Sequence, residues 1–258
     1  SPVNIVTGDF DRDGHIDIAT SGGSATISVL PGFGDGTFAS AVRYSTGYFG
    51  DQFAGGPQDV LAADVNGDTH TDAVVVFVGG PIVTQLGNGD GTFQVVPGLL
   101  LPRSAAMLAP VLADLNNDGL LDVASSTGGG ISIVLGTGDF AFPTGHADSS
   151  VGNAVVLGDF NQDGRLDMAS ANGGGFGRDV SIYLAKADGT FPTFPNAIHY
   201  NTGGNGRSIV TGDFNGDSQL DLAVANQNLR TVSVLLCNAD GTFAVAPNIP
   251  VGTVVFPT

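Results

Sequence analysis

Oxygen-bearing side chains recur along the chain at a spacing that suits a hard metal ion. Five segments share one nine-residue pattern, with Asp at positions 1, 5 and 9 and Asp or Asn at position 3. The segments begin at Asp9, Asp64, Asp114, Asp159 and Asp213. Ca²⁺ takes roughly six to eight oxygen ligands, and a tight loop with this spacing can supply them. The pattern therefore predicts five calcium loops and about five bound Ca²⁺ ions.

We expect each loop to use four side chains and one backbone carbonyl, at position 7, as ligands. The predicted side-chain ligands are Asp9, Asp11, Asp13 and Asp17; Asp64, Asn66, Asp68 and Asp72; Asp114, Asn116, Asp118 and Asp122; Asp159, Asn161, Asp163 and Asp167; and Asp213, Asn215, Asp217 and Asp221. The predicted backbone ligands are His15, His70, Leu120, Arg165 and Gln219. The alternative is that the loops are Asx turns that cap strand ends without a metal. That alternative does not explain why all five loops keep four oxygen-bearing side chains that would repel one another.

The loops differ in two ways that predict different affinities. The first loop has Asp at all four side-chain positions, so we expect it to bind calcium most tightly. The second and fifth loops have Thr69 and Ser218 at position 6, where the others have Gly. A residue with a side chain at a sharp turn predicts strain and weaker binding.

Short β-prone runs flank each loop and must position it. A run ends at the loop, a second run follows it, and a third comes after a Gly- or Asn-rich connection. An Asp-Gly-Thr-Phe turn, a strong hairpin signal, then opens a fourth run. The turns are Asp35–Phe38, Asp90–Phe93, Asp188–Phe191 and Asp240–Phe243, and the third repeat has a shortened version in Gly136–Phe140.

Repeats of this length and composition predict an all-β chain, a β-propeller of five four-stranded antiparallel blades. We expect one domain over 1–258, with blades near 1–50, 51–105, 106–150, 151–204 and 205–258. An EF-hand would need flanking helices and Glu at position 12. A calcium-binding β-roll would repeat every nine residues or so.

The stretch Gly8–Gly14, followed by Ile16–Ala19 and by Gly34–Phe38, resembles the FG-GAP/VCBS repeat. That resemblance implies the calcium-binding propeller found in integrin α-subunits, certain fungal lectins and many secreted bacterial proteins. The family includes adhesins, lectins and modules appended to enzymes, so the resemblance is specific for the repeat and not for an activity. Its members often have seven blades. Five blades indicate either a small complete ring, which the matching phase of the two ends favours, or a segment of a longer chain.

The charge balance restricts the partners. The chain has 25 acidic residues, 8 Lys or Arg and a formal charge of −17, which five calcium ions would reduce to about −7. Without a basic stripe we expect neither nucleic acid nor an anionic membrane as a partner, and no apolar run approaches the roughly 20 residues of a membrane span. Cys237 stands alone in an apolar run, which predicts a buried, inert thiol. Open oxygen sites suit the calcium levels outside cells, so we expect a secreted or cell-surface protein.

We expect a protein that is not an enzyme. No Gly-x-Ser-x-Gly motif and no zinc-like histidine spacing occurs, and the histidines at 15, 70, 146 and 199 have ordinary explanations at the surface or in the fold.

We expect a binding or adhesion module, because variable loops on a rigid scaffold usually carry recognition. The candidate contacts with a glycan or an extracellular protein are Tyr48, Phe49, Phe53 and Phe176. The alternative is a structural subunit of an extracellular assembly or filament that self-associates through edge or terminal strands. The apolar tail Val251–Phe256 predicts closure of its own ring against the first blade, β-strand addition to a neighbouring molecule, or a frayed terminus.

Overall fold

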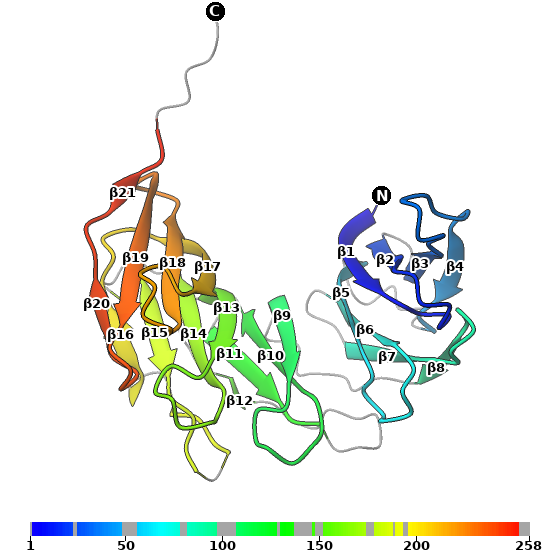
Figure 1. The fold of residues 1–258 in the computed structure, drawn as a ribbon, viewed down its shortest axis with the longest axis horizontal. Helices are drawn as coiled ribbons and strands as arrows, with labels where there is room; N and C mark the ends of the chain where they lie inside the picture. Colours follow the sequence, from blue (N-terminus) through cyan, green and yellow to red (C-terminus); the bar gives the residue numbers. More distant parts are fainter. Residues whose placement is uncertain are drawn as a thin grey trace, which may run out of the picture. The chain divides into compact units, whose positions relative to one another are not determined.

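The protein is seen in a computed structural model that describes residues 2–22, 25–47, 56–77, 82–96, 107–127, 130–136, 146–147, 152–173, 178–187, 189–192 and 196–252. Within these ranges the regular elements are β-strands, arranged in short antiparallel sheets (Figure 1). No helix of the described residues has the length and apolarity needed to cross a membrane.

The strands group into five sheets, which we number 1 to 5 in chain order. Sheet 1 holds β1 (Pro2–Gly8), β2 (Asp17–Gly22), β3 (Thr26–Leu30) and β4 (Val42–Ser45). Sheet 2 holds β5 (Pro57–Ala63), β6 (Asp72–Phe77), β7 (Ile82–Gly87) and β8 (Phe93–Val96). Sheet 3 holds β9 (Met107–Ala113), β10 (Asp122–Thr127), β11 (Gly130–Val134) and β12 (His146–Ala147). Sheet 4 holds β13 (Gly152–Gly158), β14 (Asp167–Asn172), β15 (Val180–Tyr183) and β16 (Ile198–Tyr200). Sheet 5 holds β17 (Gly206–Gly212), β18 (Asp221–Asn226), β19 (Thr231–Cys237), β20 (Phe243–Val245) and β21 (Ile249–Pro250).

Each sheet is a meander in which consecutive strands pair. The acidic loops close the hairpins between the first and second strands, because the last pair before each loop joins its position 9 to the residue before position 1. These pairs are Gly8↔Asp17, Ala63↔Asp72, Gly158↔Asp167 and Gly212↔Asp221. In sheet 5 the short β21 pairs with β19 beyond β20, so the fourth strand is made of two pieces.

The chain divides into two compact units, one made of Ser1–Asp114, Asp118–Ala124 and Ser132–His146, the other of Leu115–Asn117, Ser125–Ile131 and Ala147–Thr258. Every residue of β6 and of β14, the second strands of sheets 2 and 4, is buried. Burial on both faces explains why these strands read as nearly continuous Val, Ala and Ser runs without strict alternation.

The prediction of an all-β chain built from repeated four-stranded antiparallel sheets is confirmed. The hairpin turns are also confirmed where the structure describes them, since Gly36, Gly91 and Gly241 have positive φ of 89°, 78° and 79°. Asp188 and the shortened turn at 137–140 lie outside the described residues. At the tail, Val251 donates a backbone hydrogen bond to Arg230 of its own sheet at 3.0 Å, and residues 253–258 lie outside the described part.

Candidate metal centre

The Asp at position 9 anchors each loop to its sheet. Asp17 is fully buried, and its two carboxylate oxygens accept hydrogen bonds from the backbone N–H of Phe10 at 2.8 Å and of Gly32 at 2.7 Å. One bond reaches the loop and the other reaches the end of β3. Asp72, Asp167 and Asp221 make the same pair of bonds at 2.8–2.9 Å, and Asp122 accepts from Gly136 at 2.7 Å. The Asp at position 9 therefore joins the loop to the sheet, a structural role that its prediction as a metal ligand did not include.

The remaining loop carboxylates face inward because the backbone wraps around them. In the second loop, Asp64 accepts hydrogen bonds from the N–H groups of Gly67, Asp68 and Thr69 at 2.7, 3.1 and 2.8 Å. Asp68 in turn accepts from the N–H of His70 at 2.8 Å. These bonds turn the side chains at positions 1 and 5 toward the middle of the loop.

Positions 4 and 6 of every loop adopt left-handed backbone conformations. Glycine occupies position 6 in three loops, and position 4 in the second and fifth loops. The pairs of φ values are 60° and 86° (Arg12, Gly14), 77° and 71° (Gly67, Thr69), 59° and 86° (Asn117, Gly119), 59° and 81° (Gln162, Gly164), and 82° and 67° (Gly216, Ser218). Each loop thus has one non-Gly residue in a strained conformation. The strain predicted at Thr69 and Ser218 is present, but the other loops carry a counterpart at position 4.

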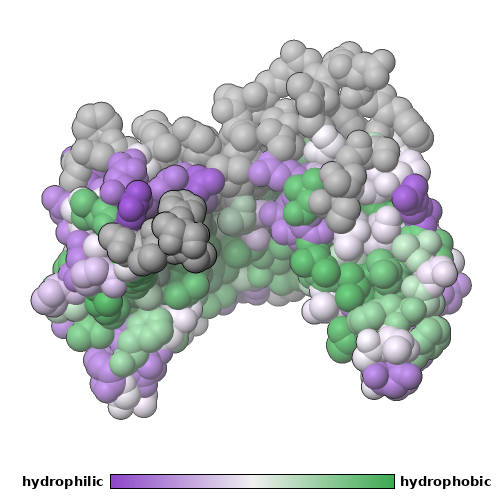
Figure 2. Space-filling view, turned by 90° about the horizontal axis from the view of Figure 1, so that it is seen from above, coloured by the Kyte–Doolittle hydropathy of each residue, from purple (hydrophilic) through white to green (hydrophobic). Residues whose placement is uncertain are grey.

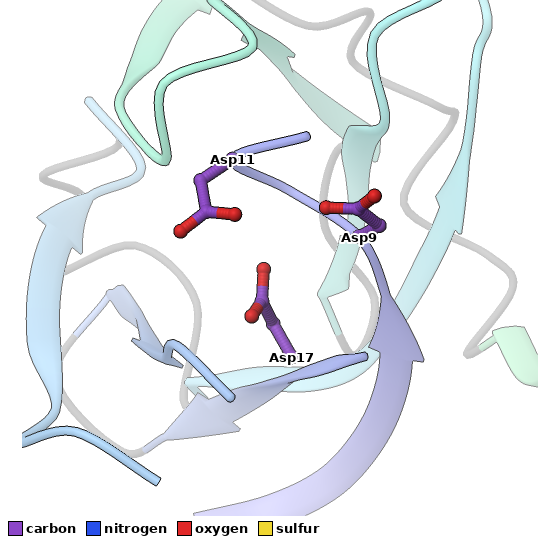
Figure 3. Close-up of side chains that lie close together, drawn as sticks. All are labelled: Asp9, Asp11 and Asp17. Atoms are coloured by element: carbon purple, nitrogen blue, oxygen red, sulfur yellow. The ribbon is translucent and has the colours of Figure 1, made fainter. Parts of the chain in front are cut away.

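The first loop brings three carboxylates together. Asp9, Asp11 and Asp17 each place an oxygen within 4.8 Å of the others, and Figure 3 shows the three groups facing a common space. Oδ1 of Asp9 is buried and has no hydrogen-bond partner among the described residues. Burial, and then repulsion from Asp17, Asp13 and Asp9, raises the pKa of Asp11. An oxygen set that repels itself and leaves a buried acceptor unpaired has the chemistry of a hard-cation site.

Three of the loops with Asn at position 3 are arranged differently. The Asn side-chain amide donates to the Asp at position 5 at 2.7 Å in Asn66–Asp68, 2.8 Å in Asn161–Asp163 and 2.8 Å in Asn215–Asp217. The bond from Asn66 is the main cause of a lowered pKa at Asp68. In the fourth loop the Arg165 guanidinium also pairs with Asp163. These loops satisfy part of their own negative charge.

Side chains at position 7 lie against the neighbouring hairpin turn. A Cβ placed on Gly34 would come within 2.4 Å of Nδ1 of His15, and one on Gly89 within 2.9 Å of Nε2 of His70. The two histidines therefore pack on the turn backbone, and glycine is needed there to make room. Coordination by the position 7 carbonyls stays a prediction.

Other groups singled out in the sequence have structural surroundings. Cys237 is buried, donates from Sγ to the Phe160 carbonyl at 3.2 Å, and has its pKa raised by burial, as expected for an inert thiol. Nδ1 of His199 lies 2.9 Å from the hydroxyl of Ser181, a fully buried serine. The sequence did not predict this pair. The candidate recognition residues Tyr48, Phe49, Phe53 and Phe176 lie outside the described residues.

The Ser181–His199 pair belongs to a buried polar ladder. Asn172 donates to Ser181 at 2.7 Å in sheet 4. In sheet 5 the matching Asn226 donates to Ser233 at 2.7 Å, and Ser233 donates to Asn248, which takes the place of the histidine. The repetition indicates that the ladder holds the second, third and fourth strands together.

Repeated meander sheets with an acidic loop in each first hairpin define a propeller-like repeat protein. A family model described as "FG-GAP-like repeat" matches residues 9–75, 64–125, 114–170 and 159–224. The chain belongs to this family, and the resemblance seen in the sequence is confirmed. A search of curated proteins by sequence found no match.

Solved structures share the fold at low identity. An Agrocybe aegerita lectin, described as recognising non-reducing terminal N-acetylglucosamine, is 20% identical with a TM-score of 0.62, covering 94% of this chain and 64% of its own. The periplasmic gluconolactonase of Pseudomonas aeruginosa is 16% identical with a TM-score of 0.66, covering 97% and 70%. The V. cholerae biofilm matrix protein Bap1 is 19% identical with a TM-score of 0.55, covering 98% and 40%. The chain thus spans less than two thirds of the lectin and of the biofilm protein.

The expectation that the chain is not an enzyme is wrong as an exclusion. The Pseudomonas aeruginosa gluconolactonase is an enzyme with a similar fold. The absence of a Gly-x-Ser-x-Gly motif and of zinc-like histidine spacing excludes only the reactions that depend on those motifs. At this identity the likeness shows the fold alone, which is compatible with both binding proteins and enzymes.

Proposed function

We propose that this chain is a secreted or cell-surface, calcium-stabilised binding module in which the five sheets serve as blades of a propeller. The family match and the lectin and biofilm-matrix neighbours support a binding module. The five acidic loops support calcium, and oxygen-rich sites of this kind support an environment with abundant calcium.

The observation that carries the calcium proposal is the first loop. Asp9, Asp11 and Asp17 converge there, and Oδ1 of Asp9 is buried without a donor. A Ca²⁺ ion would be held by these three side chains with Asp13, and it would supply the positive charge that the cluster lacks. Binding to the folded loop stabilises the fold, by about 2.7 kcal/mol per site at a hundredfold excess over Kd.

For the partner we propose a glycan or an extracellular protein. The support is the described sugar recognition of the Agrocybe aegerita lectin and the matrix location of Bap1. The aromatic residues Tyr48, Phe49, Phe53 and Phe176 are the proposed contacts, because aromatic faces beside polar groups suit sugar rings.

Native mass spectrometry with and without chelator tests the metal. We expect about five calcium ions per chain, each lost on chelation, and fewer than three would contradict the proposal. Binding to a glycan array, measured with calcium and with chelator, tests the partner class. Because an enzyme shares the fold, the same preparation should be assayed for gluconolactone hydrolysis, and calcium-dependent turnover would replace the binding proposal with an enzymatic one.

A further inference from the structure

Two of the acidic loops contain an Asn–Gly pair at positions 3 and 4. The pairs are Asn66–Gly67 in the second loop and Asn215–Gly216 in the fifth loop. The third and fourth loops have the same Asn at position 3, but there it is followed by a residue with a side chain, in Asn116–Asn117 and Asn161–Gln162. An Asn that precedes Gly is especially prone to lose its side-chain amide, because the Gly nitrogen has no side chain beside it to obstruct its approach to the Asn carboxamide. The residue at position 4 therefore separates two loops with a reactive asparagine from two loops without one.

The fourth loop has the same local structure as the two Asn–Gly loops. Position 4 is left-handed in all three, with φ of 77° at Gly67, 82° at Gly216 and 59° at Gln162. Oδ1 of Asn161 accepts a hydrogen bond from the backbone N–H of Asp163 at 3.1 Å, as its counterparts do in the other two loops. The fourth loop therefore differs at the reacting residues mainly by its side chain at position 4, which makes it an internal control.

The backbone N–H of the Gly in each pair points at a carboxylate. The N–H of Gly67 donates to Oδ1 of Asp64 at 2.7 Å, and the N–H of Gly216 donates to Oδ1 of Asp213 at 2.7 Å. The Gly nitrogen must lose this proton when it attacks the Asn carboxamide, and a carboxylate within hydrogen-bond reach is placed to accept it. The position 1 Asp of each loop thus serves as a proton acceptor.

The carboxamide of the Asn in each pair is polarised by a backbone donor. Oδ1 of Asn66 accepts a hydrogen bond from the N–H of Asp68 at 2.9 Å, and Oδ1 of Asn215 accepts one from the N–H of Asp217 at 2.9 Å. Negative charge develops on this oxygen when a nitrogen adds to the carbonyl carbon, so the N–H donor stabilises the addition. Each Asn–Gly loop therefore places a proton acceptor on the attacking group and a donor on the group that is attacked.

Water has access to both Asn–Gly pairs. Gly67, Asn215 and Gly216 are exposed, and Asn66 is half-buried. A Cβ placed on either glycine would meet no other atom within 4 Å. Hydrophilic residues, the class to which Asp and Asn belong, reach the surface in Figure 2 as purple areas. The open surroundings leave room for a ring to form at each pair and for water to open it.

We propose that Asn66 and Asn215 are sites of spontaneous deamidation. The Gly nitrogen forms a bond to Cγ of the Asn, and its proton passes through the position 1 carboxylate to Nδ2. The bond between Cγ and Nδ2 breaks, Nδ2 leaves as ammonia, and a succinimide ring remains. Water then adds to one of the two ring carbonyls, and the ring opens to Asp or to isoaspartate. The net change is the replacement of ammonia by water, without oxidation or reduction.

The two products change the loop in opposite ways. Asp at position 3 adds a fourth carboxylate, as in the first loop with its Asp11, and a higher ligand charge raises the affinity for Ca²⁺. Isoaspartate lengthens the main chain by one methylene group, which displaces the ligands on either side of it. A bound Ca²⁺ ion would hold the position 1 carboxylate and the Asn Oδ1, so we expect calcium to slow the reaction. This last expectation rests on the proposed calcium function, whereas the reaction itself does not.

The first test is peptide mapping by mass spectrometry after the whole chain has been incubated at mildly alkaline pH, in chelator and in saturating calcium. In chelator we expect Asn66 and Asn215 to gain the mass that accompanies replacement of an amide by a carboxyl group, while Asn161 stays unchanged over the same period. Asn88, which precedes Gly89 in a hairpin turn outside the acidic loops, reports general loosening of the fold and should react alike in both conditions. Persistence of Asn66 and Asn215 in chelator, or equal conversion of Asn161, would overturn the proposal.

The second test transfers the reaction to the fourth loop. Gln162→Gly creates an Asn–Gly pair at a position whose φ is already positive, so the fold should tolerate it. We expect Asn161 to become reactive in this variant and to stay intact in the matched control Gln162→Ala. An Asn161 that is as stable in Gln162→Gly as in the native chain would refute the proposal.

Calcium counts from native mass spectrometry separate this proposal from the metal proposal. If calcium ions are counted and Asn66 still reacts equally in calcium and in chelator, protection by the metal is refuted. If no ions are counted, the metal proposal fails, while reaction of Asn66 and Asn215 without reaction of Asn161 still supports deamidation.

Discussion

The first and second acidic loops share a fold but treat their negative charge differently. Asp11 of the first loop meets other carboxylates, whereas Asn66 at the same position donates to Asp68 at 2.7 Å. Asp64 accepts three backbone hydrogen bonds in the second loop. Its counterpart Asp9 accepts one from Gly14 at 3.2 Å and keeps a buried Oδ1 without a partner among the described residues.

The difference shows that the same loop backbone can either favour binding of a cation or keep its shape without one. A loop with four carboxylates gains more from a cation but costs more without one, because like charges repel at short range. A loop with an internal amide donor keeps its shape at lower cost and has less to gain from the ion. We therefore expect affinity and metal-free stability to run in opposite directions between the two loops.

The largest effect should come from the anchor that the two loops share. Asp17→Ala and Asp72→Ala each leave two backbone N–H groups without their acceptor, at about 1–3 kcal/mol per group. We expect each variant to lose about 2–6 kcal/mol in urea unfolding, both in calcium and in chelator. Asp13→Ala, in an exposed position, is the control and should cost little in chelator. If the loss at Asp17 vanished in chelator, that residue would act only through the metal.

Exchanging Asp and Asn at position 3 should reverse the differences in calcium affinity and metal-free stability between the first and second loops. Asp11→Asn removes one repelling charge, so in chelator we expect stability to rise by about 0.5–1 kcal/mol. In calcium it should lower the affinity of the first loop on the order of tenfold, because affinity follows ligand charge. Asn66→Asp should do the reverse in the second loop. Calorimetric titration measures the calcium affinity, and unfolding in chelator measures the metal-free stability. If a substitution changed both quantities in the same direction, the proposed opposition between affinity and metal-free stability would be wrong.

The pH dependence of the metal-free protein should sharpen the comparison further. The pKa of Asp11 is raised in the folded state, first by burial, so its charged form destabilises the fold at neutral pH. As pH falls through that raised pKa toward the unfolded value of about 3.9, the penalty is relieved. In chelator, the stability advantage of Asp11→Asn over the native chain should therefore shrink between pH 7 and about pH 4. An advantage that stays constant over this window would assign it to packing instead of charge.

The place of the acidic loops between first and second strands, and the strand order, were predictable because both are local. Positions 1, 3, 5 and 9 fall on one turn, and the flanking β-prone runs must pair across it. The anchoring role of Asp17 was not predicted, although a signal existed. Position 9 is Asp in all five loops and sits inside an apolar run, while position 3 varies between Asp and Asn.

The aromatic residues that pack between neighbouring sheets of one unit could not be assigned from sequence for a different reason. Phe38, Phe93 and Phe243 have the same local sequence, yet they are 41% exposed, half-buried and 6% exposed. Their burial depends on whether a Phe and a Tyr from the preceding sheet meet them, and those partners come from a separate repeat. The hydrogen bond from the Tyr44 hydroxyl to Gly91 spans 47 residues and has no signature in either segment.

The smallest effect should be confined to one carboxyl group of the second loop. The pKa of Asp68 is lowered chiefly by the hydrogen bond from the Asn66 side chain. Asn66→Ala should raise this pKa toward its ordinary value, which ¹³C NMR of the carboxyl carbons would detect in chelator. Thr92→Val is the matched control, because the Thr92 hydroxyl is the main cause of the lowered pKa of Asp90. This substitution should raise the pKa of Asp90 and leave the pKa of Asp68 unchanged.

A lowered pKa in the folded state gives stability above the unfolded pKa that disappears as pH falls through the folded one. Asn66→Ala should reduce that acid-sensitive part alone, and an unmoved Asp68 would show that the amide does not set the charge of this loop.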